Sequence, residues 1–105
     1  MSTQKIEKQR WIEYFDHLSS VTDKQLVTIE IAGLSIGDQT EVEDAPFDGI
    51  SYDDGDDVIT VQAGDIGHMI KQPGEVYVLE EDDGLKSIEV TDSEDNKHIL
   101  MFKPA

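Results

Sequence analysis

The chain has 105 residues, enough for one domain and too few for two ordinary ones. It contains no cysteine, which excludes disulfides, thiol chemistry and cysteine-ligated zinc or iron–sulfur centres. Its net charge of −16 argues against nucleic-acid binding through phosphate neutralisation and against an anionic membrane surface. Because the N-terminal "MSTQKIEKQR" is polar and no apolar run approaches the roughly 20 residues of a membrane span, we expect a soluble, cytoplasmic protein.

The negative charge is unevenly placed along the chain. Residues 1–24 carry as many bases as acids, whereas residues 25–105 carry 20 acids and four lysines. The stretch 25–70 contains eleven acids and neither lysine nor arginine. Three explanations remain open for this pattern: solubility, a salt-rich cytoplasm, or a basic partner.

The first predicted element is an amphipathic helix over about residues 3–19. Ile6, Trp11, Phe15 and Leu18 recur at spacings of three to five and would share one apolar face. A helix of this length is marginal alone in water. We therefore expect the apolar face to dock on the rest of the domain.

From about residue 25 to residue 103 the pattern alternates, which predicts about seven short strands. The polar "GDQTEVED" (37–44) and the terminal "HILMFK" (98–103) are expected at sheet edges. Turn-rich clusters such as "DDGDD" and "KQPGE" recur between the strands, as in antiparallel sheets. The predicted fold is therefore α+β: one N-terminal helix packed on an antiparallel β-meander or small barrel, in a single domain over 1–105.

Five segments taken in order, "RWIEYFDHLS", "IEIAGLSIGDQTE", "GISYDDGDDVI", "GHMIKQPGEVYV" and "GLKSIEVTDSEDNKHILMFK", resemble the bacterial family known as domain of unknown function 5335. The resemblance spans nearly all of residues 9–103. It is most specific at Tyr14-Phe15-Asp16 with Leu18-Ser19, Gly37-Asp38-Gln39, Gly49-Ile50-Ser51-Tyr52-Asp53, and His68 with Ile70, Pro73, Val76 and Tyr77. It implies a single-domain cytoplasmic bacterial protein, and it implies no activity because the family is uncharacterised.

The chain departs from the family pattern at three places. Similar sequences often carry Asp at the position of Gly67, a second histidine at Gln72, and Pro-Lys at Asp54-Gly55. The first two departures argue against a shared metal or acid–base centre around the histidine. The third indicates that the acidic tip is not a family feature.

The acidic tip is the first candidate site, because Asp53, Asp54, Asp56 and Asp57 crowd around Gly55. Carboxylate oxygens suit calcium, but this spacing matches no standard calcium loop and no glutamate follows at the required distance. A hairpin turn explains the same residues, since glycine takes positive φ readily and aspartate tolerates turn geometry. We therefore predict a turn, with the four aspartates as weak metal candidates.

The second candidate is a segment containing His68, Pro73 and Tyr77, where the resemblance is specific. His68 adjoins apolar residues, and a structural hydrogen bond is the expected role of its imidazole. His17 lies near the end of the predicted helix, where the dipole favours a cation. His98 begins the last strand and is expected to face outwards.

No catalytic pattern is present in the sequence: it has no nucleophile elbow and no phosphate-binding glycine loop. We therefore expect a non-enzymatic protein without a cofactor that acts through protein–protein contact, with an unknown protein partner or as a homodimer. Two alternatives stay open. One is an acidic decoy or inhibitor of a basic, nucleic-acid-binding partner. The other is weak divalent-cation binding at the aspartate-rich turns.

Overall fold

The computed structural model describes residues 2–21, 25–33, 37–82 and 84–104. The elements in chain order are β1 (Ser2–Lys5), the 3₁₀ helix η1 (Lys8–Arg10), α1 (Trp11–Val21), β2 (Gln25–Gly33), β3 (Gly37–Asp53), β4 (Val58–Ala63), β5 (Ile66–Lys71), β6 (Pro73–Glu81), β7 (Gly84–Asp92) and β8 (Lys97–Pro104). Neither helix in these ranges has the length and apolar character that a membrane crossing needs.

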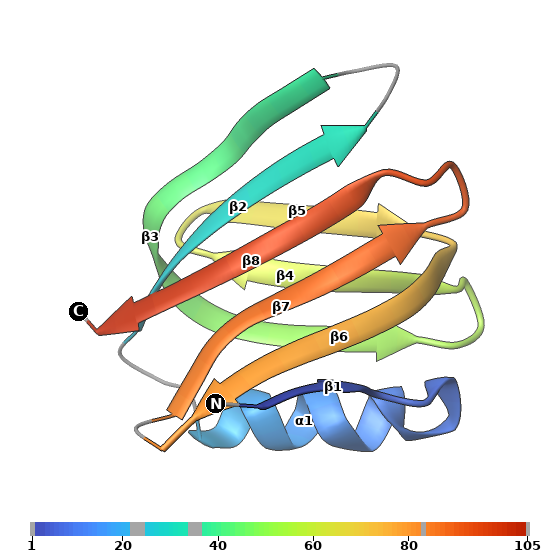
Figure 1. Cartoon of the computed structure of the whole chain (residues 1–105), viewed down its shortest axis with the longest axis horizontal. Coiled ribbons are helices and arrows are strands. Elements are labelled where there is room, and N and C mark those ends of the chain that lie inside the picture. Colours follow the sequence, from blue (N-terminus) through green and yellow to red (C-terminus); the bar gives the residue numbers. More distant parts are fainter. Residues whose placement is uncertain (1, 22–24, 34–36, 83, 105) are drawn as a thin grey trace.

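The strands form one eight-stranded antiparallel sheet in the order β1-β6-β7-β8-β2-β3-β4-β5. The sheet folds over on itself, so that β4 and β5 lie behind β7 and β8, and α1 runs along the side where β1 lies (Figure 1). The predicted α+β class, with one helix on an antiparallel sheet, is confirmed. The sheet does not close into a barrel, because β1 and β5 do not pair.

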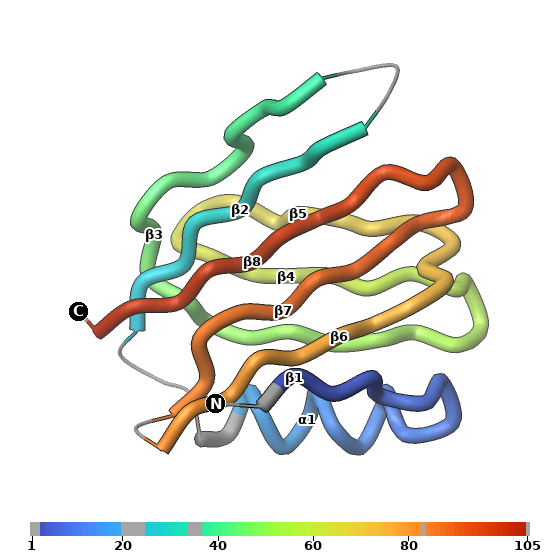
Figure 2. Tube along the Cα trace, viewed as in Figure 1, coloured from blue at the N-terminus to red at the C-terminus, as the bar shows by residue number. Residues whose placement is uncertain are grey.

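The fold-over takes place within β3, which Figure 2 shows as a long curved segment. Its first part pairs with β2 up to Pro46, and its second part pairs with β4 from Phe47 onwards. Register shifts interrupt both ladders, and Asp44 has a positive φ of 49°. Bulges of this kind bend a strand and increase its twist, which lets one strand serve both layers.

The N-terminal prediction was wrong in its boundaries. Residues 2–5 are strand β1, paired with β6 from Ser2↔Glu80 to Lys5↔Tyr77, and α1 begins only at Trp11. The partner strand is about 70 residues away in sequence, so the helical spacing of the first residues could not reveal it. The structure describes eight strands where about seven were predicted, and β1 is the strand that the prediction did not include.

The two edge predictions had different outcomes. The segment 37–44 is mostly exposed and, in the described part of the chain, pairs on one side with β2, so its edge position is confirmed. The prediction for 98–103 was wrong, because β8 lies between β7 and β2 near the middle of the sheet. Alternating apolar residues look alike in an edge strand and a central strand when only one face is buried.

The helix docks as predicted through its aromatic face. Trp11 is 1% exposed, and its ring meets the ring of Tyr52 edge-on, with 5.0 Å between centroids. The indole Nε1–H donates to the Ile6 carbonyl at 2.8 Å, which satisfies the buried donor. Phe15 is fully buried, whereas Ile12 lies on the outer face and is 45% exposed.

Ser19 fastens the helix to the free side of β3. Its hydroxyl donates to the Ile50 carbonyl at 2.8 Å and accepts from the Ile50 N–H at 2.9 Å. Gly49 lies beside this contact, and a Cβ built there would be in ordinary van der Waals contact with the serine Oγ, at 3.5 Å. The hydroxyl therefore replaces the strand that would otherwise pair with this part of β3.

We expect Ser19→Ala to lower the free energy of unfolding by about 1–3 kcal/mol, because it leaves the N–H and C=O of Ile50 without partners. Urea denaturation followed by circular dichroism measures the change. Ser51→Ala is the matched control, because Ser51 lies on the same strand with an exposed side chain. Equal stabilities for the two variants would contradict the bridging role of Ser19.

Candidate functional site

The four aspartates of the acidic tip form the β3–β4 turn. The Asp53 carboxylate accepts hydrogen bonds from the backbone N–H groups of Gly55 (2.9 Å) and Asp56 (3.3 Å). The residue with positive φ is Asp57, at 53°, and not Gly55 as the sequence suggested. The predicted turn is confirmed, and an aspartate takes its left-handed position.

Asp57 is held by structural partners. Its carboxylate accepts the hydroxyl proton of Tyr52 at 2.7 Å and lies 3.6 Å from the Lys8 ammonium. Burial, followed by the hydrogen bond and negative charge of Asp57, raises the pKa of Tyr52 to about 12. Among the residues with defined coordinates, no group of three or more histidine or carboxylate side chains is arranged to hold a metal ion.

A chain of three polar side chains joins the two layers of the sheet. His68 on β5 lies with its Nε2 3.0 Å from the Nδ1 of His98 on β8. The Nε2 of His98 lies 2.9 Å from Oδ2 of Asp92, at the end of β7. His98 is buried, with 6% of its surface exposed, so the prediction that it faces outwards was wrong.

Asp92 is positioned by the β7–β8 turn that it ends. Its Oδ1 accepts the backbone N–H groups of Glu94 (2.9 Å) and Asn96 (3.0 Å), and its Oδ2 receives the Asn96 amide at 3.4 Å. Burial alone would raise the pKa of Asp92, but the hydrogen bond from His98 and those from the turn outweigh it and lower the pKa. Asp92 is therefore a carboxylate at neutral pH and accepts a hydrogen bond from the Nε2–H of His98.

This carboxylate sets the tautomers along the chain. With its Nε2 protonated, neutral His98 has a lone pair on Nδ1, which accepts the Nε2–H of His68. Neutral His68 then keeps its own lone pair on Nδ1. Burial and the neighbouring His98 lower the pKa of His68, while the Glu41 carboxylate on β3 opposes the shift. The lowered pKa favours neutral His68 at neutral pH.

The structure separates the three residues of the predicted segment. His68 belongs to the chain described above, and Pro73 lies opposite Asp92 in the β6–β7 ladder. Tyr77 lies elsewhere on β6, where its hydroxyl donates to Glu75 at 3.3 Å. The sequence analysis missed the partners Asp92 and His98. The sequence could have predicted the contact between Asp92 and His98, because these residues lie on either side of a turn and could meet across it. No local feature of the sequence linked that turn to β5.

The backbone hydrogen bonds show which groups of β5 are unpaired. The N–H and C=O of Ile50 bond Ser19, so they point away from β4. In an antiparallel pair of strands, two residues that lie opposite each other either both direct their N–H and C=O groups towards the partner strand or both direct them away from it. Val61, opposite Ile50 on β4, therefore directs its groups towards β5, where it faces His68.

The N–H and C=O of His68 consequently form hydrogen bonds with β4. Along β5, residues that bond β4 alternate with residues whose N–H and C=O groups point away from it. The bond from the Gln72 N–H to the Asp57 carbonyl, at 2.9 Å, follows the same alternation. Gly67, Met69 and Lys71 therefore direct their N–H and C=O groups outwards, away from the sheet. Within the described part of the chain, they form a row without a strand partner on the β5 edge.

The β5 edge is chemically unlike the exposed first part of β3, residues 37–44. The strand Ile66–Lys71 contains no acid, whereas the exposed part of β3 contains four, at Asp38, Glu41, Glu43 and Asp44. Met69 is 54% exposed and Ile66 is 45% exposed. Charged side chains protect an edge from pairing, and β5 has only Lys71, at its end.

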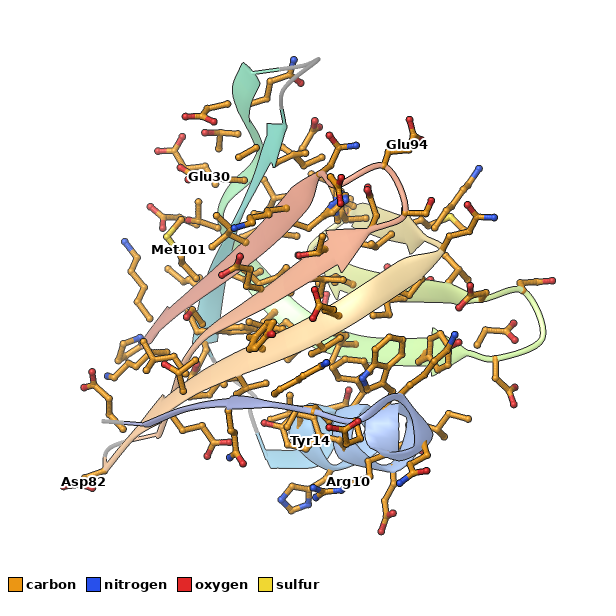
Figure 3. All side chains as sticks on the ribbon, turned by 45° about the vertical axis from the view of Figure 1, so that its right-hand side comes forward. Arg10, Tyr14, Glu30, Asp82, Glu94 and Met101 are labelled. Atoms are coloured by element: carbon orange, nitrogen blue, oxygen red, sulfur yellow. The ribbon has the colours of Figure 1, made fainter. Side chains whose placement is uncertain are left out.

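Two features flank the β5 edge. The outer ends of β2 and β3 extend past β5 (Figures 1 and 3). Met69 and Lys71 of β5 also line a hollow of about 550 Å³, together with Asp56, Val58, Gln72, Ser93 and Glu94. Glu94 projects from the β7–β8 turn in Figure 3, and neither His68 nor His98 lines the hollow. The edge is thus bordered by acidic side chains while carrying none itself.

Comparisons with known proteins give a family without an activity. The family described as "Family of unknown function (DUF5335)" matches residues 2–105. A protein of Aquifex aeolicus (strain VF5) named "Uncharacterized protein" is 44% identical over 106 residues, which covers 100% of this chain and 96% of that protein. No solved structure matches the chain.

Proposed function

The chain belongs to the DUF5335 family of unknown function, and from the geometry of its β5 edge we propose that it is a protein-binding module. A basic, extended segment of a partner would add as a further strand beside β5. The unpaired backbone row at Gly67, Met69 and Lys71 carries the proposal. The partner's backbone would complete the ladder that β4 begins, as in strand-addition complexes generally.

The charges around the edge favour a basic segment. Glu41 reaches the neighbourhood of His68 from β3, and Asp56 and Glu94 line the hollow. Four lysines elsewhere are already paired with carboxylates: Lys5 with Glu75, Lys8 with Asp57, Lys97 with Glu89 and Lys103 with Asp44. The domain therefore has many more carboxylates than cations, and few of its cations would repel a basic strand.

A single strand suits the edge better than a second copy of the domain. Pairing two β5 strands side by side would bring the overhanging ends of β2 and β3 of each copy towards the sheet of the other. Two copies would also add two charges of −16. An extended segment has neither difficulty.

Binding also suits this site better than catalysis. Asp92 orients His98, but the lone pair that it directs is already used by His68. The free lone pair is on Nδ1 of His68, whose side chain does not line the hollow. A general base must reach the proton that it removes. The proposed module is accordingly non-enzymatic, cytoplasmic, and an acidic partner for a basic protein.

We expect a blocked eight-residue peptide of alternating valine and lysine to bind the domain, whereas the matched valine–glutamate peptide does not. Amide NMR titration should place the largest shift changes on β5. Bound peptide should also slow hydrogen exchange at Gly67, Met69 and Lys71, because their N–H groups gain partners.

The matched variants are Met69→Pro and Met69→Ala. Proline removes the outward N–H and leaves the β4 ladder intact, since edge strands tolerate proline at such positions. Alanine removes the side chain alone. We expect proline to abolish peptide binding and alanine to reduce it less than fivefold. Shift changes centred away from β5, or equal binding by both variants, would refute strand addition at this edge.

A further inference from the structure

We propose that the Asp92–His98–His68 chain is a proton-operated latch that holds β5 against the facing layer and opens when both imidazoles are protonated. The latch belongs to the same surface as the proposed strand-addition site, and its effect on binding rests on that proposed function. Its own opening is a property of the free protein. The contacts that carry it are the 3.0 Å His68–His98 contact and the 2.9 Å His98–Asp92 contact.

The latch can accommodate one added proton but not a second. With no added proton, His68 Nε2–H donates to His98 Nδ1, and His98 Nε2–H donates to Asp92. One added proton is accommodated, because His98 can donate from both nitrogens while His68 shifts its own hydrogen to Nδ1 and accepts at Nε2. A second proton places two N–H groups and two positive charges face to face. The contact between the rings then has no acceptor and must separate.

Among the residues that the structure describes, the titratable groups that interact with the pair act at its outer ends and not between the rings. Asp92 faces His98 from β7, and Glu41 approaches His68 from β3. On β4 the residue opposite His68 is Val61, which does not titrate. Asp92 and Glu41 thus stabilise positive charge at the two outer ends of the pair. They do not reduce the repulsion between His68 Nε2–H and His98 Nδ1–H.

Separation of the rings affects β5 because the contact crosses between layers. His98 is on β8 in the middle of the sheet, and His68 is on the terminal strand, which has β4 as its one neighbouring strand. Loss of the cross-layer bond leaves β5 held by its pairing with β4 and by the buried side chain of Ile70. The second proton also adds positive charge beside the proposed basic segment. Both effects weaken binding as the pH falls.

The latch is tested directly by long-range ¹H–¹⁵N NMR of the histidine rings in the free protein. We expect His98 to carry its hydrogen on Nε2 and His68 also on Nε2 near neutral pH. Acidification should protonate the pair in two coupled steps, the second accompanied by faster hydrogen exchange at His68 and Ile70. Independent titration of the two rings, without change at β5, would overturn the proposal.

Its consequence is tested with the valine–lysine peptide at pH 7.5 and pH 5.5. We expect binding by the wild type to weaken at least fivefold at the lower pH, a change of the size that coupling between two binding events typically produces. His68→Gln can donate its amide N–H to neutral His98 and accept from protonated His98 through its carbonyl oxygen, so it should remove most of this dependence. His17→Gln removes an exposed imidazole on α1 and should behave as the wild type.

The two proposals fail in distinguishable ways. Absence of peptide binding at both pH values refutes strand addition, and the NMR titration still decides the latch. Peptide binding with the same pH dependence in wild type and His68→Gln refutes the latch and leaves strand addition standing. Carboxylates elsewhere act equally on all three proteins, because they remain mostly ionised at pH 5.5.

Discussion

Replacing Trp11 by alanine is expected to lower the free energy of unfolding by about 3–5 kcal/mol. The indole is 1% exposed, packs edge-on against Tyr52 and donates to the Ile6 carbonyl. Alanine leaves a cavity where α1 meets β3 and an unpaired carbonyl beside it. Small domains have total stabilities of about 5–15 kcal/mol, so this single change removes a large share. Thermal and urea denaturation measure it.

Ile12→Ala is the control for the Trp11 prediction. It removes an apolar side chain from the adjacent helical position, but Ile12 is 45% exposed on the outer face. We expect a change within about 0.5 kcal/mol. A Trp11→Ala variant as stable as Ile12→Ala would show that the helix does not contribute to the core in the way described.

Replacing Asp92 by alanine is expected to lower the free energy of unfolding by about 3 kcal/mol at pH 7. The carboxylate accepts four hydrogen bonds, one from the buried His98 and three from the β7–β8 turn. Its loss leaves a buried imidazole N–H and two backbone N–H groups without this acceptor. Glu94→Ala, in the same turn but with an exposed side chain, should leave stability almost unchanged.

The pH dependence supplies a second measurement on the same variant. The folded pKa of Asp92 lies below its ordinary value of 3.8, so its contribution to stability is present above pH 3.8 and is lost as the pH falls through the folded pKa. The folded pKa of His68 also lies below its ordinary value, 6.5. The contribution of His68 to stability is therefore present above pH 6.5 and is lost as the pH falls through the folded pKa. The Asp92→Ala protein should lack the loss of stability that occurs below pH 3.8 in the wild type and arises from Asp92. An unchanged acid limb would contradict the assigned role of Asp92.

The aromatic face of the helix and the alternating strands could be predicted because short-range spacing encodes them. Trp11, Phe15 and Leu18 repeat at helical intervals, and β2 and β6 alternate along their length. The β3–β4 turn was equally local, since its aspartates and glycine favour turns in any context. These features depend on neighbours within about one helical turn or one hairpin.

The start of the helix and the position of β8 could not be predicted in this way. Residues 2–5 become a strand because β6 offers them a partner, and β8 becomes central because β2 pairs with it from the other end of the chain. Propensity is weak compared with such pairing. The same limit explains why His98 was expected to face outwards.

The sequence by itself determined an acidic, cysteine-free α+β domain, its helix face, its turns and its family resemblance. Composition and local periodicity are sufficient for these. The tertiary structure alone decided that Asp92, His98 and His68 meet, and that Gly67, Met69 and Lys71 have unpaired backbone groups. Both depend on the fold-over of the sheet within β3, which brings β5 against β8 and leaves β5 at an edge. Contacts between residues 30 positions apart come from packing, and no local pattern specifies them.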